Sequence, residues 1–180
     1  MRKLLSNFTV FDLLKITMLA ALGIAVGAII GPLVRIVTGP LFIPGGAVAG
    51  GIYMLFLVLA VSFTGKKSAA FLCGLTQAFI VMVTGLGGHH GAMTIVTYTM
   101  PGVAVLLVLL VFRHNGCCKL CMFFCGMAAN LTGTFLVGVG VMALPFVPMM
   151  LSLTMAALSG GLGGLLGWVL TIRIKKMGVI

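Results

Sequence analysis

Two adjacent histidines, His89 and His90, are the side chains in this sequence best suited to chemistry near neutral pH. They stand in a glycine-rich stretch, where imidazole groups can hydrogen-bond a solute, coordinate a metal or haem iron, or simply be hydrated. A metal site normally uses three or four ligands at suitable spacing, and we expect no carboxylate or cysteine on the same face. We therefore predict solute contact for this pair, with a hydrated loop and metal or haem coordination as the alternatives.

Two side-chain amides and a tyrosine are further candidates for contact with a solute. Gln77 and Asn130 each lie near the middle of a long apolar segment, where a polar group is costly and often functional. An amide offers donors and an acceptor that suit the edge of a heteroaromatic ring, although it can instead join two helices by a hydrogen bond. Tyr98 can supply an aromatic face to the solute or belong to an aromatic belt at the membrane interface.

Arg35 is separated in the sequence from the other basic residues. An arginine can hold a carboxylate or a phosphate by two hydrogen bonds, or extend to the lipid headgroups from the end of a helix. The only acidic residue in the chain is Asp12. The outer side therefore has no carboxylate to serve as a counter-ion for a cationic solute. We predict a neutral or anionic solute.

The cysteines and the missing acids bear on catalysis. Cys117, Cys118, Cys121 and Cys125 have spacings related to thiolate metal sites, but reduced cysteines in an apolar segment usually act as small hydrophobic side chains. We favour that interpretation and predict no metal and no cofactor. With a single acid and no Glu, carboxylate-pair hydrolases and proton relays are excluded. The basic residues are too scattered for a nucleic-acid surface, and we predict that the protein is not an enzyme.

Long apolar segments must position these side chains. The chain is 62% hydrophobic and 7% charged, which cannot cover a surface that faces water. A bilayer core is crossed by about 20 apolar helical residues, and irregular backbone exposed to lipid is not tolerated. We predict one all-α integral-membrane domain over residues 1–180, with six transmembrane helices near 16–36, 44–63, 68–84, 94–112, 120–142 and 148–172.

The distribution of charge predicts the orientation of this bundle. With the N-terminus in the cytosol, ten of the eleven basic residues lie on the cytosolic side and only Arg35 lies outside. Both termini are then cytosolic. Before the first span, residues 8–14 are expected to form a short interfacial helix that Thr9 caps. The outer connections are rich in Pro and Gly, and we expect them to fold back onto the bundle.

Pairs of small residues four positions apart predict close helix packing in lipid. They occur in the first, second and last spans as Ala21/Ala25, Gly23/Gly27, Gly46/Gly50, Gly160/Gly164 and Gly163/Gly167.

Together these features resemble the substrate-binding S component of energy-coupling factor (ECF) transporters, in its uncharacterised or thiamine-precursor-like branch. The layout is similar, Ala21 and Ala25 match that family's alanine motif, and the segments 39–46 and 85–102 are similar to outer loops of the family. The resemblance implies capture of a vitamin-like solute in the prokaryotic plasma membrane, with Ala21 and Ala25 facing a transmembrane coupling subunit that works with two cytosolic ATPases. The chain itself has no phosphate-binding Gly-Lys-Ser/Thr loop. A stand-alone channel or secondary carrier is the alternative.

Overall fold

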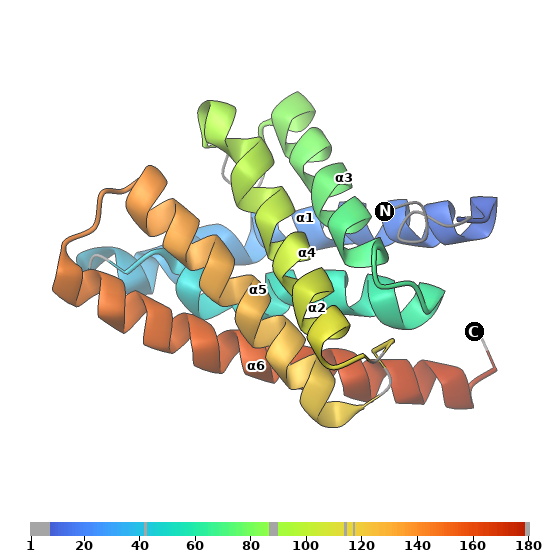
Figure 1. The fold of residues 1–180 in the computed structure, drawn as a ribbon. Helices are drawn as coiled ribbons and strands as arrows, with labels where there is room; N and C mark the ends of the chain where they lie inside the picture. Colours follow the sequence, from blue (N-terminus) through green and yellow to red (C-terminus); the bar gives the residue numbers. More distant parts are fainter. Residues whose placement is uncertain (1–7, 42, 87–89, 114, 117, 179–180) are drawn as a thin grey trace.

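The computed structural model is built from six α-helices (Figure 1). It describes residues 8–41, 43–86, 90–113, 115–116 and 118–178, and within these ranges it contains no strand. The helices are α1 (Val10–Thr38), α2 (Gly45–Thr64), α3 (Ala69–Thr84), α4 (Thr94–Val111), α5 (Lys119–Gly140) and α6 (Phe146–Lys176). Short 3-10 turns, η1 (Gly39–Leu41) and η2 (Gly91–Met93), lead into α2 and α4. The predicted all-α class is confirmed.

Five of the six helices are long and apolar enough to cross a bilayer, and α3 is a shorter apolar helix of 16 residues. The protein is therefore a multi-pass membrane protein. The six helices coincide with the six predicted segments to within a few residues, apart from the start of α1. That α3 also crosses, and that both termini are cytosolic, stay predictions.

The predicted separate interfacial helix at residues 8–14 is wrong, because α1 runs unbroken from Val10 to Thr38. The predicted cap is confirmed: the Asp12 N–H donates to Thr9 Oγ1 at 3.2 Å, and the Thr9 N–H donates to Asp12 Oδ2 at 3.1 Å. The same carboxylate accepts from Lys66 Nζ at 2.7 Å. No glycine or proline interrupts the chain between Asp12 and the first span, so the helix simply continues.

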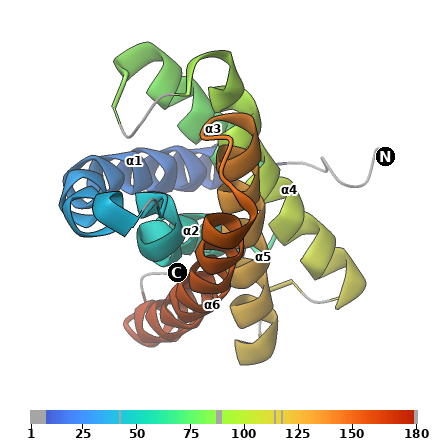
Figure 2. The ribbon, with the colours of Figure 1, turned by 90° about the vertical axis from the view of Figure 1, so that its left-hand side faces the viewer.

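Helix α2 lies at the centre of the bundle. It packs against α1, α3, α5 and α6, and more weakly against α4, while α5 packs on both α4 and α6. Figure 2 shows α2 between α1 and α6. Because α1 contacts mainly α2 and α3, one long side of α1 is left uncovered.

The glycine pairs predicted on the last helix do pack closely against its neighbours. A Cβ on Gly163 would collide with the backbone of Gly51 on α2, and a Cβ on Gly164 would collide with the carbonyl of Met122 on α5. The two pairs therefore pack against different helices: Gly163/Gly167 faces α2, and Gly160/Gly164 faces α5. Without them the backbones of α2, α5 and α6 would not approach as closely as they do.

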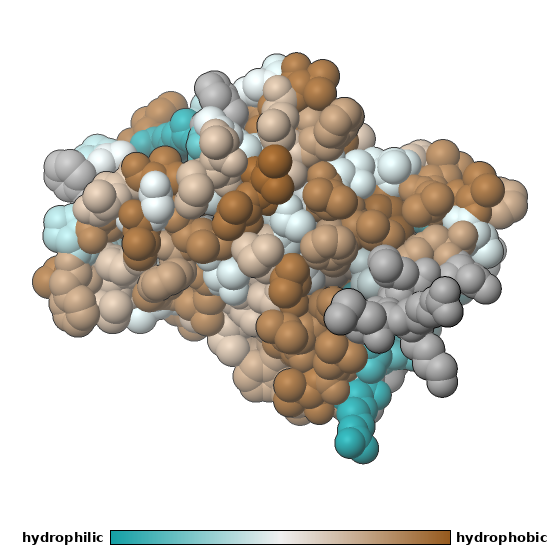
Figure 3. All heavy atoms as spheres, turned by 45° about the horizontal axis from the view of Figure 1, so that its top comes forward, coloured by the Kyte–Doolittle hydropathy of each residue, from teal (hydrophilic) through white to brown (hydrophobic). Residues whose placement is uncertain are grey.

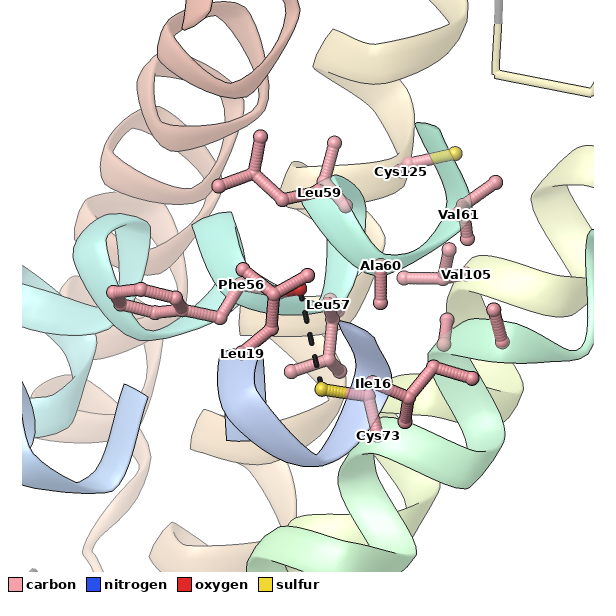
Figure 4. Packing of buried hydrophobic residues seen from close by; sticks show 14 of the residues in the cluster. Ile16, Leu19, Phe56, Leu57, Leu59, Ala60, Val61, Cys73, Val105 and Cys125 are labelled. Atoms are coloured by element: carbon pink, nitrogen blue, oxygen red, sulfur yellow. Dashed lines mark hydrogen bonds between the residues drawn. The ribbon is translucent and has the colours of Figure 1, made fainter. Parts of the chain in front are cut away.

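The solid core fills only one half of the bundle. Its buried side chains come from five helices (Figure 4): Ile16, Leu19 and Ala20 of α1, residues 56–61 of α2, Ala69, Ala70 and Cys73 of α3, Val105 and Leu109 of α4, and Cys121, Met122, Cys125 and Ala129 of α5. Cys73 points its thiol toward the Phe56 carbonyl oxygen at 4.0 Å. This half contains the α2–α3 and α4–α5 connections and the end of α6, at the same end as the start of α1 in Figure 1.

The cysteines near α5 pack as small side chains in this half. Cys118 caps α5, since its Sγ accepts from the Cys121 N–H at 3.3 Å, and Cys121 and Cys125 are fully buried. Cys117 lies outside the described residues. The face of the molecule seen in Figure 3 is apolar over most of its area, as a surface in contact with lipid requires.

Candidate functional site

A cavity of about 630 Å³ occupies the half of the bundle that the core leaves open. Its lining comes from α1 to α5 and from the connections before α2, before α4 and after α5. On each helix the lining ends at or near the core, and Leu57 of α2 belongs to both. The lining residues nearest to the core are Gly23, Leu57, Gln77, Pro101 and Asn130.

The wall formed by α1 is built from residues at intervals of four. Gly23, Gly27, Gly31 and Arg35 lie on one helix face and all line the cavity. The ring of Tyr53 on α2 stands opposite, 3.5 Å from where a Cβ of Gly27 would lie, and its hydroxyl is 3.4 Å from the corresponding point on Gly31. The missing side chains of α1 therefore leave room for this ring and for the cavity beside it.

The structure brings five of the six predicted solute-contact residues to this one cavity. They come from four helices and from the residue just before η2, and they are Arg35, Gln77, His90, Tyr98 and Asn130. His89 lies outside the described residues. The His90 backbone N–H donates to Thr94 Oγ1 at 2.9 Å, which fixes this residue against the start of α4.

Asn130 joins three helices at the bottom of the cavity. Its Nδ2 lies 3.2 Å from the Ala47 carbonyl oxygen, 2.9 Å from that of Ala156 and 2.8 Å from Ser159 Oγ. The Ser159 hydroxyl in turn donates to the Ala47 carbonyl at 2.6 Å. A Cβ on Gly50 would overlap the Asn130 amide, so that glycine makes room for it. These contacts favour the interhelical alternative for Asn130.

Gln77 differs from Asn130 in its contacts. Its side chain is 5% exposed and stands beside Gly23, where a Cβ would lie 2.6 Å from Nε2. Within the described ranges the amide makes no hydrogen bond to protein. Its donors and its acceptor are thus available to a molecule in the cavity.

We expect the two amides to separate stability from binding when each is changed. Replacing Asn130 by Ala removes donors from buried acceptors on α2 and α6 and should cost about 1–3 kcal/mol of stability. Replacing Gln77 by Leu removes no protein hydrogen bond and should leave stability unchanged or higher. Thermal unfolding of the purified variants in detergent checks this. Equal melting temperatures for the two variants would contradict the assignment.

Two lining residues were not anticipated from the sequence, Tyr53 and Thr38. Tyr53 and Tyr98 are the only tyrosines in the chain, and both line the cavity together with Arg35. Thr38, the last residue of α1, is 5% exposed, and its Oγ1 is buried without a hydrogen-bond partner in the part of the chain that is described. The scarcity of tyrosine was a signal for Tyr53. Thr38 belongs to the Pro/Gly-rich outer connection that was expected from the sequence to fold back onto the bundle.

Ala21 and Ala25, the predicted partner-facing residues, lie on the uncovered side of α1 and are exposed. Large apolar side chains surround them on this side, including Met18, Leu22 and Ile29. The two alanine side chains are small compared with these neighbours, which permits close approach of another helix.

Comparisons with known proteins agree with this architecture. A family model described as "ABC-type cobalt transport system, permease component" matches residues 14–132, about two thirds of the chain. A solved structure described as "Crystal structure of an S-component of ECF transporter" is similar with a TM-score of 0.79 and 21% sequence identity, over 96% of this chain and 88% of that chain. At this identity the likeness shows a shared fold. A comparison with curated proteins gave no match.

Proposed function

Because this chain belongs to the family of permease components of ABC-type cobalt transport systems, we propose that it is the solute-capture subunit of an ECF importer. The S-component fold covers nearly the whole chain and includes the helices that line the cavity. In this function the protein binds a solute and a partner complex supplies the energy. It is a transport subunit and not an enzyme.

The observation that carries the proposal is a cavity that ends at a packed core. The lining reaches Leu57 on α2 and Asn130 on α5, and the packed side chains of the core begin at these levels. Among the described residues, a solute that enters the bundle therefore meets packed apolar side chains at the core and no polar path beyond them. This arrangement favours a receptor that must be moved by something else, and it disfavours the alternative of a stand-alone channel or secondary carrier.

The orientation of the cavity follows from the distribution of charge. The basic residues Lys66, Lys67 and Arg113 lie in connections at the core end, whereas Arg35 lies at the cavity end. If the basic end is cytosolic, both termini are cytosolic and the cavity opens outward. An importer in a prokaryotic plasma membrane needs this orientation.

We propose a small organic molecule as the cargo, a vitamin or a related compound, in preference to a bare cobalt ion. Among the described residues no group of three or more His, Cys, Asp or Glu side chains could hold a metal ion. The cavity instead offers amide, hydroxyl and aromatic groups with one guanidinium, which suit a neutral or anionic organic solute.

The partners in this proposal are a transmembrane coupling subunit and two cytosolic ATPases, and nucleic acid has no part in it. The exposed face of α1 around Ala21 and Ala25 is the surface offered to the coupling subunit. The chain has no Walker loop of its own, so ATP hydrolysis must come from the partners.

A thermal-shift screen of the purified protein tests the capture role. Vitamins, vitamin precursors and haem are added in turn, and a ligand present at 100 times its Kd should stabilise the protein by about 2.7 kcal/mol. We expect at least one organic compound to raise the melting temperature and Gln77→Leu to weaken that shift. A response to Co²⁺ with none to the organic compounds would contradict the proposed cargo.

A further inference from the structure

We propose that the mouth of the cavity contains an oxyanion subsite at the amino end of α2, formed by Arg35, Thr38 and the first backbone N–H groups of Gly45 and Gly46. The inference rests on the proposed function in one respect, that the cavity is the solute site. It commits the solute to carrying a carboxylate or phosphate group. Neither the sequence nor the comparisons assign a role to Thr38, Gly45 or Gly46.

Within the described part of the chain, no side-chain hydrogen bond caps the amino end of α2. The first N–H groups of a helix have no acceptor in a preceding turn, and the N-cap residue, Pro44, makes no side-chain hydrogen bond to them. The helix is 20 residues long and its first two residues are Gly45 and Gly46, both of which line the cavity. A Cβ on Gly46 would meet no atom within 4 Å, so this backbone is open to a ligand. Such an end attracts anions.

Thr38 independently indicates a ligand at the same place. Its side chain is more than nine-tenths buried and lines the cavity. Its Oγ1 lies 3.6 Å from where a Cβ of Gly45 would be, and it has no hydrogen-bond partner among the described residues. Burying a hydroxyl without a hydrogen-bond partner is unfavourable. An oxyanion beside Gly45 would accept its hydrogen bond.

Arg35 completes the subsite with a full positive charge. It lies one helical turn before Thr38, and its Cγ is 3.1 Å from the same Cβ position on Gly45. The only acid of the chain, Asp12, is at the far end of α1, where it pairs with Lys66. Across the described residues the Arg35 guanidinium makes no ion pair or hydrogen bond. The Arg35 side chain, the Thr38 hydroxyl and the first residues of α2 thus meet beside Gly45, and together these groups suit an oxyanion.

Three ring-bearing probes of similar size test the charge preference. Phenyl phosphate, benzyl alcohol and phenyltrimethylammonium are titrated by calorimetry into the full chain in phosphatidylcholine nanodiscs. We expect phenyl phosphate to bind at least about tenfold more tightly than benzyl alcohol, and the cation to bind most weakly, because hydrogen bonds to a charged group are stronger than those to a neutral one. Binding of phenyltrimethylammonium as tight as that of phenyl phosphate would overturn the proposal.

Two variants assign the preference to these residues. Arg35→Gln should remove most of the advantage of phenyl phosphate over benzyl alcohol, and Arg35→Lys should keep part of it. Thr38→Val keeps the shape of the side chain and should weaken phenyl phosphate binding about threefold or more without lowering the melting temperature of the unliganded protein. If both Arg35→Gln and Thr38→Val leave phenyl phosphate binding unchanged, the subsite does not exist.

Nanodiscs with added phosphatidylglycerol distinguish the source of the oxyanion. Competition by this lipid, lost in Arg35→Gln, would identify a headgroup phosphate as an occupant of the subsite, and absence of competition would identify the solute. Failure of the proposed function can be distinguished from failure of the subsite. A chain that shows the Arg35-dependent preference but never assembles with a coupling module retains the subsite and loses the function, and a transporting complex without the preference shows the reverse.

Discussion

Replacement of both Ala21 and Ala25 by leucine is expected to abolish solute uptake while leaving solute binding intact. Both alanines are exposed on the side of α1 that none of the other described helices covers. Leucine there adds bulk where a partner helix must come close, and overpacking costs about 1–3 kcal/mol at each site. Co-purification with the coupling subunit should fall at least about tenfold, which corresponds to 1.4 kcal/mol.

The matched control enlarges two exposed side chains on a different helix, α6. Thr154 and Val169 are exposed on α6, so Thr154→Leu with Val169→Leu enlarges the lipid-facing surface away from α1. We expect this variant to co-purify like the unmodified protein. Full assembly of the Ala21→Leu/Ala25→Leu variant, or equal loss in the control, would show that α1 is not the docking face.

Filling the mouth of the cavity should have an equally large effect, on binding instead of assembly. Gly46 lines the cavity, and a Cβ there would meet no atom within 4 Å. The first atom of a side chain at this position therefore meets no clash. We expect Gly46→Phe to weaken binding of the solute found by the thermal-shift screen about 100-fold or more, a loss of about 2.7 kcal/mol.

Gly46→Ala and Val48→Leu are the controls for this variant. The first adds one methyl group at the same backbone position, and the second adds bulk to an exposed residue one half-turn further along α2. Gly46→Ala should have a smaller effect than Gly46→Phe, and Val48→Leu should bind like the unmodified chain. Unweakened binding in a well-folded Gly46→Phe protein would remove this cavity as the solute site.

The positions of the helices were predictable from the sequence because charges, prolines and glycine clusters interrupt apolar runs. Polar side chains within those runs were also informative, since lipid makes them costly. Gln77 and Asn130 were chosen for this reason, and they line one cavity together with Arg35, His90 and Tyr98. The assignment of a solute contact to each of them is still a prediction.

Which way each helix faces was not predictable in the same way. In lipid both the buried and the exposed sides of a helix are apolar, so hydropathy gives no rotational phase. Tyr53 therefore appeared as an ordinary aromatic residue, and the Gly23/Gly27 pair appeared as a simple packing motif although it lines the cavity. The partners of Asn130 on α2 and α6 are 83 and 26 residues away along the chain and become evident only in three dimensions.

Uptake into proteoliposomes tests most directly whether this protein captures solute for a separate motor. The chain is reconstituted alone and with a coupling subunit and two ATPases, and accumulation of the screened solute is followed with and without ATP. We predict accumulation only with the complete complex and ATP, and binding without flux for the chain alone. Steady flux through the chain alone in the absence of ATP would contradict the account.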